Sequence, residues 1–470
     1  MLFNSFQFLY FLTVVWTVNF FLPHRWRWAW LLGASCYFYM QFIPIYILIL
    51  LITIVIDYYA GIWIEQTDDP IKKKRFLSLS ILSVCAVLFV FKYFNFFNAN
   101  AATLAKMIGW NYPVAALRII LPIGLSFHTF QSLSYVIEVY RGHQKAERHF
   151  GIYALYVMYF PQLVAGPIER PQNLLPQFHR ERNVTWEQFR DGLFLALWGL
   201  VKKVMIADCV SQYTDTVYNY NVNHSGTSLL LGTYFFAIQI YCDFSGYSDI
   251  ARGVSRMFGV ELMKNFETPY FARSISEFWS RWHISLSTWF RDYVYIPLGG
   301  NRVSPARTFL NLFVVFLISG FWHGANWTFL IWGALHGVYL IGERLLGGSH
   351  KDAAEQNQSA LVQFLKIAVT FHLVLISWIL FRARSVQEAW SIFYKILFDH
   401  GPVFWNVIII QSAMAIVILL IVDLFHWRTK FWDRIAEFPI ALRVSAALVL
   451  LFAIVLFGVE SQNQFIYFQF

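Results

Sequence analysis

Long apolar segments separated by short polar ones repeat along almost the whole chain. A stretch of roughly 20 apolar residues is long enough to cross a bilayer as a helix. The pattern therefore predicts an all-α, polytopic integral membrane protein with ten or eleven transmembrane helices, the segment 308–342 counting as one long or two short ones. The apolar segments recur at about 3–22, 28–40, 44–64, 76–97, 118–139, 191–210, 227–250, 308–342, 362–381, 405–425 and 439–458.

Two regions depart from this pattern. The segment from Phe150 to Pro171 is apolar but is broken by Pro161, Gly166 and Pro167, and both its flanks are basic. We expect it to be re-entrant, because irregular backbone at membrane depth persists only against protein or water. The stretch from Arg252 to Arg307 is too rich in Lys and Arg to span, so we expect it to lie on or dip into the cytoplasmic face.

Composition agrees with a membrane protein. The chain is 58% hydrophobic and 13% charged, whereas an ordinary soluble domain is about 25% charged. The net charge of +9 comes from basic residues in short loops, which indicates the positive-inside bias of membrane proteins and not a nucleic-acid surface. Loops 65–75 and 170–190 should be cytoplasmic, and the Lys- and Arg-free loop 211–228 and the N-terminus should lie outside. With no internal repeat or separate soluble segment, we expect one membrane-embedded domain over 1–470.

The stretch that follows Arg273 combines a helix start with an aromatic stripe. Ser274 and Glu277 have the spacing of a capping box. An apolar stripe then recurs at spacings of three and four, which predicts one amphipathic interfacial helix. His283 borders this stripe, and the pattern alone favours a structural role for it. The stripe consists of Trp279, Trp282, Leu286, Trp289 and Tyr293.

A histidine in an uncharged segment raises a sharper question. From Phe309 to Gly342 the chain has no Lys, Arg, Asp or Glu, yet it contains His323 and His336. An ionisable group at membrane depth must be satisfied, and its default interpretation is functional. For His323 the alternatives are a functional group or a histidine hydrogen-bonded between helices. His336 lacks neighbouring Asn or Gly at a break, so we expect it to be structural.

Several familiar chemistries find no support in the sequence. The ligand spacing of a metal site is missing, as are a nucleophile elbow, a phosphate-binding loop and a dinucleotide fingerprint. We therefore expect no metal, no bound cofactor, no ATP-driven transport and no nicotinamide chemistry.

Several motifs in order give the chain a family resemblance. "SRWHISLSTWFRDYVYIPLGGNR" and "SGFWHGANW" are preceded by "LPIGLSFHTFQSLSYVIEVYRG", "YFPQLVAGPIERP", "QIYCDFSGYSDIARG" and "NFETPYFARSISEFW". Together they resemble the membrane-bound O-acyltransferase superfamily, in its bacterial alginate O-acetyltransferase branch, mainly over residues 121–342. One departure is Glu138, where relatives often carry Asp.

The resemblance implies roles for particular residues. His323, in the "WHG" motif, would be catalytic, as a general base or as an acyl acceptor, and these two alternatives stay open. His283, in "RWHISLS", would orient the thioester or stabilise the oxyanion. Candidates for lining a substrate tunnel are Trp322, Asn326, Trp279, Trp282, Arg291, Gly166, Gln239 and Asp243.

The resemblance also implies a reaction and its setting. An acetyl group would pass from a cytoplasmic thioester such as acetyl-CoA across the bacterial cytoplasmic membrane to hydroxyls of an exported polysaccharide, through a periplasmic or membrane-tethered partner. Arg281, Arg291 and Arg302 would attract the phosphates of CoA or only reflect orientation bias. Alternatives are D-alanyl transfer to teichoic acid, peptidoglycan O-acetylation, and, from another class, a solute or lipid transporter, although the inverted repeat typical of transporters is missing.

Overall fold

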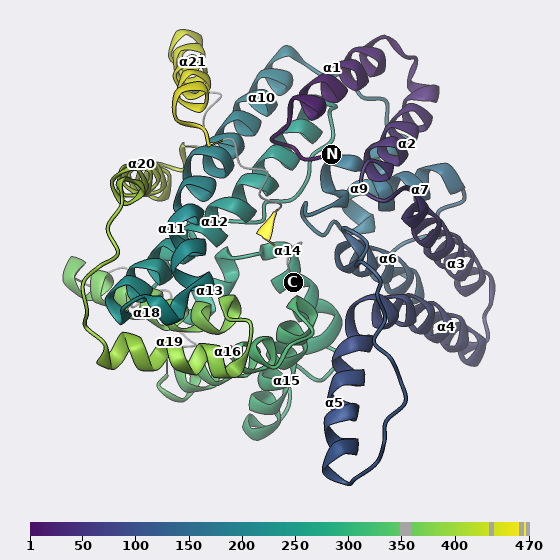
Figure 1. Ribbon diagram of the computed structural model, residues 1–470. Coiled ribbons are helices and arrows are strands. Elements are labelled where there is room, and N and C mark those ends of the chain that lie inside the picture. The colour runs from purple at the N-terminus through teal and green to yellow at the C-terminus, as the bar shows by residue number, and fades with distance from the viewer. Residues whose placement is uncertain (348–358, 432–436, 460–464, 467–470) are drawn as a thin grey trace. The chain divides into compact units, whose positions relative to one another are not determined.

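The fold of the chain is all-α. A computed structural model describes residues 1–347, 359–431, 437–459 and 465–466, and the regular elements assigned within these ranges are all helices. Figure 1 labels these helices. The backbone groups into two compact units, a first unit of residues 1–192 and 251–263 and a second unit of residues 193–250 and 264–470. That the chain forms a single domain stays a prediction.

The first unit contains the N-terminal helices. A short π-helical turn, Phe89–Tyr93, joins α4 to α5, so that helix continues from Pro70 to Met107. The chain passes between the units within α10 (Trp186–Leu200), within α12 (Gly226–Met257) and again between Met263 and Lys264. The other helices are α1 (Phe6–Phe21), α2 (His24–Met40), α3 (Ile47–Gln66), α4 (Pro70–Leu88), α5 (Phe94–Met107), α6 (Leu125–Tyr140), α7 (Phe150–Met158), α8 (Phe160–Leu163) and α9 (Pro171–His179).

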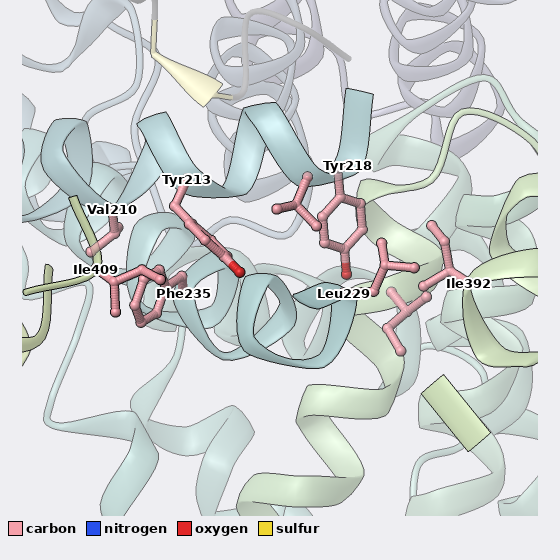
Figure 2. Packing of buried hydrophobic residues seen from close by; sticks show 9 residues of the cluster. Val210, Tyr213, Tyr218, Leu229, Phe235, Ile392 and Ile409 are labelled. Atoms are coloured by element: carbon pink, nitrogen blue, oxygen red, sulfur yellow. The ribbon is translucent and has the colours of Figure 1, made fainter. Parts of the chain in front are cut away.

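The second unit has its own apolar core. Tyr213 from α11 packs edge-on against Phe235 from α12, with ring centroids 5.3 Å apart, and Ile392 from α19 and Ile409 from α20 belong to the same cluster (Figure 2). The helices are α11 (Asp208–Asn219), α13 (Ile275–Arg281), α14 (Ile284–Phe290), α15 (Pro305–His323), α16 (Trp327–Leu345), α18 (Ala360–Arg382), α19 (Val386–Phe398), α20 (Val407–Thr429) and α21 (Ile440–Phe457).

Five of the described helices are long and apolar enough to cross a membrane. α1 and α21 are shorter apolar helices. The chain is therefore a multi-pass membrane protein, and the total of ten or eleven crossings stays a prediction. The five candidate spans are Pro44–Gln66, Pro70–Met107, Pro305–His323, Ala360–Arg382 and Val407–Thr429.

The structure corrects two details of the predicted elements. The apolar segment 118–139 is helical only from Leu125, because Gly124 before it has a left-handed backbone with φ of +75°. The amphipathic helix predicted after Ser274 is two short helices, α13 and α14, followed by a π-helical turn. The interruption occurs at Trp282 and His283, where His283 adopts φ of +44°. Periodicity cannot reveal such a break, because the aromatic spacing continues across it.

Candidate active site

The second unit brings His283 and His323 to one indole ring. The ring of Trp322 lies with its centroid 4.9 Å from that of His323 and 6.1 Å from that of His283. All three side chains are buried. Two residues 40 positions apart in the chain (323 − 283 = 40) thus meet at one place, as expected if both serve the same reaction.

His323 is held by a tight helical hairpin. It is the last residue of α15, and α16 begins after Asn326, whose side-chain oxygen accepts a hydrogen bond from Thr328 N at 3.2 Å. Between the two helices a Cβ on Gly320 would lie 2.2 Å from the carbonyl oxygen of Phe329. Only glycine permits this approach. The imidazole also contacts Trp332 and Phe381, at 5.0 and 5.4 Å between ring centroids. Its neighbours are therefore mainly aromatic rings.

His283 occupies the turn between α13 and α14. Its ring lies edge-on to Phe244, with centroids 4.5 Å apart, and parallel to Phe266 at 6.5 Å. The side chain is fully buried, and this burial lowers the pKa of His283 to about 3. At neutral pH the ring is therefore uncharged, with one nitrogen carrying a proton.

His336 has the contacts of a structural histidine. Its Nδ1 lies 3.3 Å from Trp279 Nε1 and its Nε2 lies 2.9 Å from Ser377 Oγ. An indole N–H can only donate, so Nδ1 is the acceptor. Ser377 Oγ donates to the carbonyl of Val374, so His336 Nε2 carries the proton that reaches it. Both ring nitrogens are thus engaged, as a structural role requires.

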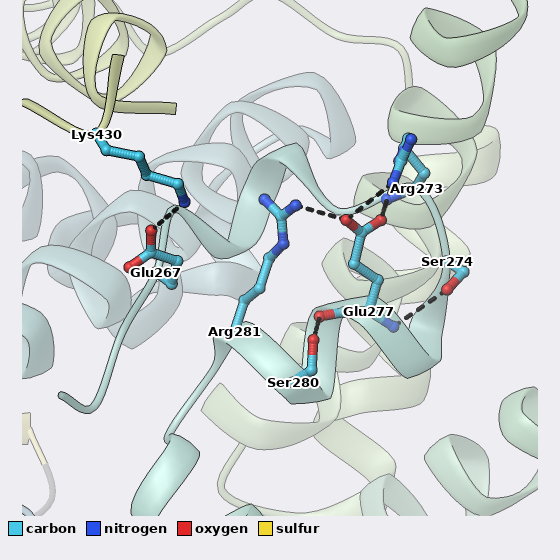
Figure 3. A network of polar contacts seen from close by, with 7 residues as sticks. All are labelled: Glu267, Arg273, Ser274, Glu277, Ser280, Arg281 and Lys430. Carbon is cyan, nitrogen blue, oxygen red and sulfur yellow. Dashed lines mark hydrogen bonds and ion pairs between the residues drawn. The ribbon is translucent and has the colours of Figure 1, made fainter. Parts of the chain in front are cut away.

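An ion-pair network surrounds Glu277, in the first turn of α13. Ser274 caps the helix by accepting a hydrogen bond from Glu277 N at 3.1 Å, which confirms the predicted helix start. Figure 3 shows the Glu277 carboxylate between Arg273 and Arg281, both hydrogen-bonded to it. Arg281 is therefore held by a carboxylate. Arg291 is exposed and pairs with its neighbour Asp292.

The remaining tunnel candidates of this unit have mixed surroundings. Trp282 is buried against Trp378, with ring centroids 5.2 Å apart. The Asp243 carboxylate forms an ion pair with Lys203 Nζ at 2.7 Å, and Lys203 also pairs with Asp208 at 2.8 Å. This buried ion pair holds the π-helical turn Val201–Ala207 to α12. The Nδ2 of Asn326 donates to the carbonyl of Arg384 at 2.8 Å. Gln239 Oε1 is buried and accepts no hydrogen bond from the described residues.

Gly166 belongs to the first unit, in the segment predicted to be re-entrant. The helix there is interrupted at Tyr159, between α7 and α8. A Cβ on Gly166 would lie 2.3 Å from the Cα of Gln162, so the local turn itself requires glycine. A tunnel role for Gly166 stays a prediction, and a bulky substitution there would disturb the fold before it obstructed anything.

The sequence pattern did not single out several residues around His283. Phe244 and Phe266 pack on the ring of His283. Asn265 accepts hydrogen bonds from Ile284 and Ser285, the two residues after His283. Asn265 and Phe266 lie within a motif that carried the resemblance, but nothing in their spacing predicts contact with His283. Lys203 was detectable as a charge within an apolar segment. Among the described residues no group of three or more His, Cys, Asp or Glu is placed to share a metal ion.

Comparisons with known proteins identify the family of the chain. Residues 149–386 match the model of the membrane-bound O-acyltransferase family. The probable alginate O-acetylase of Pseudomonas aeruginosa is 41% identical over 85% of this chain and 75% of its own length. That of Pseudomonas putida is 35% identical over the whole of both chains, and the peptidoglycan O-acetyltransferase of Helicobacter pylori is 36% identical over 77% and 72%. The chain therefore belongs to the membrane-bound O-acyltransferase family and is a membrane-embedded acyltransferase.

Proposed function

We propose that this protein moves an acetyl group from a cytoplasmic thioester, such as acetyl-CoA, toward hydroxyl groups of an exported polysaccharide. The protein would sit in a bacterial cytoplasmic membrane, and a periplasmic or membrane-tethered partner would complete the transfer to the polymer. The observation that carries the proposal is the meeting of His283 and His323 at Trp322. The similarity to alginate O-acetylases over most of the chain supports acetyl as the acyl group and polysaccharide as the acceptor.

The positions of the two histidines on their helices favour different roles. His323 lies at the C-terminal end of α15, where the helix dipole stabilises a positive charge. This suits a residue that takes up the hydroxyl proton as general base, or that becomes cationic as an acyl-histidine. His283 lies at the N-terminal end of α14, where the dipole disfavours protonation. A neutral, buried imidazole N–H suits stabilisation of the developing oxyanion.

The proposed reaction balances without any cofactor. The acceptor oxygen forms a bond to the thioester carbonyl carbon, the C–S bond breaks, and the hydroxyl proton passes through His323 to the leaving thiolate. In the acyl-histidine route a ring nitrogen of His323 first bonds to the carbonyl carbon while the C–S bond breaks and the thiolate leaves. The hydroxyl oxygen then takes the acyl group from that nitrogen, and the hydroxyl proton passes through the ring to the thiolate. Both routes use the same two histidines.

The first prediction concerns these histidines. His323→Ala should lower polymer acetylation by about 10²–10⁴-fold, the usual effect of removing a general base, and His283→Ala should also be impaired. The measurement is ester-linked acetate on the exported polymer, divided by the amount of each variant in the membrane. The control is His400→Ala, an exposed histidine after α19, which should behave as wild type. Wild-type acetate with His323→Ala at normal abundance would contradict the assignment.

Peptidoglycan is the second candidate acceptor, because a peptidoglycan O-acetyltransferase is 36% identical to the chain. The two acceptors are separated by assaying ester-linked acetate on purified peptidoglycan and on the exported polysaccharide of one strain that carries or lacks this protein. Acetate that disappears only from peptidoglycan would favour the second candidate.

A further inference from the structure

The backbone at His283 has a conformation that few side chains adopt. Its φ and ψ are +44° and +53°, in the left-handed region, which costs energy for most residues other than Gly and is adopted most often among them by Asn, Asp and His. In the described ranges only Thr268, His283 and Lys430 share a positive φ among non-glycine residues. Such strain persists where surrounding contacts hold it in place.

Those contacts come from the segment that begins at Asn265. The carbonyl of Asn265 accepts a hydrogen bond from Ile284 N at 3.0 Å, and Glu267 N donates to the carbonyl of Arg281 at 2.9 Å. Two backbone hydrogen bonds thus fix the chain on either side of His283.

The side chain of Asn265 supplies the cap of α14. The side chain of an N-cap residue usually accepts a hydrogen bond from a free N–H group in the first turn of its helix, but the His283 side chain makes no such capping bond. Instead Asn265 Oδ1 accepts from Ser285 N at 3.1 Å and from Ser285 Oγ at 3.0 Å. Asn265 Nδ2 in turn donates to Ser248 Oγ of α12 at 3.3 Å. Asn265, Ser248 and Ser285 are all buried.

We propose that Asn265 is a positioning residue for His283, an inference that rests on the proposed role of His283 in acyl transfer. The Asn265 side chain caps α14 in place of His283, so the imidazole does not have to serve as the cap. Asn265 also holds the left-handed turn that places the imidazole between Phe244 and Trp322. A buried asparagine that served only stability would not act through His283. The two roles differ in whether the effects of the two residues are independent.

The test is a double-mutant cycle in inside-out membrane vesicles that retain the partner protein and the acceptor polymer of the host. Transfer of radiolabelled acetyl from acetyl-CoA to polymer is measured against acetyl-CoA concentration, per amount of folded protein. Asn265→Ala should lower kcat by roughly 10- to 100-fold, the size of effect found for residues that orient metal-binding histidines, with KM for acetyl-CoA little changed. Asn265→Asp keeps the accepting oxygen and should recover most of kcat. In the His283→Ala background, Asn265→Ala should cause no further loss.

The matched control is Asn311, another buried asparagine of the same unit, which donates to the carbonyl of Leu298 at 3.1 Å. Asn311→Ala should lower stability but leave kcat per folded protein unchanged. If Asn265→Ala does not reach the membrane, Ser285→Ala takes its place in the cycle, since it removes one hydrogen bond to the same oxygen.

Additive losses in the cycle, or wild-type kcat in Asn265→Ala, would overturn the positioning role while leaving acyl transfer in place. By contrast, the absence of any transfer by the wild-type protein would count against the proposed function itself. The two failures are therefore distinguishable.

Discussion

At the scale of single residues, three buried histidines of the second unit differ in what holds them. His336 has partners on both ring nitrogens, one from α13 and one from α18. His323 and His283 are instead surrounded mainly by aromatic rings. The sequence placed His323 and His336 in the same uncharged segment and favoured a structural role for His336 alone. It could not predict the partners of His336, because they lie in helices distant in the sequence. The break at His283 escaped prediction for a related reason, since a left-handed turn held by Asn265 leaves no trace in the aromatic spacing.

This difference makes a prediction for His336. His336→Ala should destabilise the protein by about 1–3 kcal/mol, because it leaves the buried Trp279 N–H without its acceptor. Activity per folded protein should stay close to wild type, in contrast to His323→Ala. Thermal unfolding in detergent, followed by tryptophan fluorescence, together with acetyl transfer corrected for folded protein, provides the measurement. Loss of acetyl transfer by a fully stable His336→Ala protein would contradict this prediction and indicate that His336 takes part in the reaction.

At the scale of elements, the hairpin of α15 and α16 fixes the position of His323. The segment 308–342 was expected as one long or two short helices, and it is two, reversing at Gly324 and Asn326. Gly333 faces the partner helix so closely that a Cβ would lie 2.3 Å from the carbonyl oxygen of Phe316. Small residues at such an interface let helix backbones approach in a membrane. The sequence shows these glycines but not which of them face the partner helix.

A pair of matched glycine substitutions tests this packing. Gly333→Ala should destabilise the protein by about 1–3 kcal/mol, because the added methyl forces the two helices apart, and should reduce transfer by shifting His323. Gly342→Ala, in the same helix with nothing within 4 Å of its added Cβ, should be neutral or stabilising by up to about 1 kcal/mol. Unfolding temperatures and transfer rates of the two variants are compared directly. Equal behaviour of both would show that the close approach at Gly333 is unimportant.

At the scale of the whole molecule, the sequence predicted an all-helical membrane protein because apolar length and helical class follow directly from composition along the chain. It was less informative about charges within apolar segments. Lys203 of a π-helical turn forms buried ion pairs with Asp208 of α11 and with Asp243 of α12, and the pair with Asp243 joins segments remote in sequence. Such pairing lowers the cost of charge away from water. A charged residue within an apolar segment is therefore not evidence that the segment is exposed to water. The charges of the loops still indicate how the protein is oriented in the membrane.

Orientation matters to the proposed function, because a cytoplasmic thioester and an exported hydroxyl must reach one protein from opposite sides. Loop charge predicts that the loop containing Val222 lies outside and that the stretch containing Val303 is cytoplasmic. Both residues are exposed, Val222 by 81% and Val303 by 37%. Neither residue lies in a helix that contacts His283 or His323.

In a variant without the four native cysteines, Val222→Cys in sealed cells should react with a membrane-impermeant maleimide. Val303→Cys should react only after the membrane is opened, and the retained acetyl transfer of each variant serves as the control for folding. Labelling of both positions from outside would contradict the predicted topology and, with it, the supply of donor and acceptor from opposite faces.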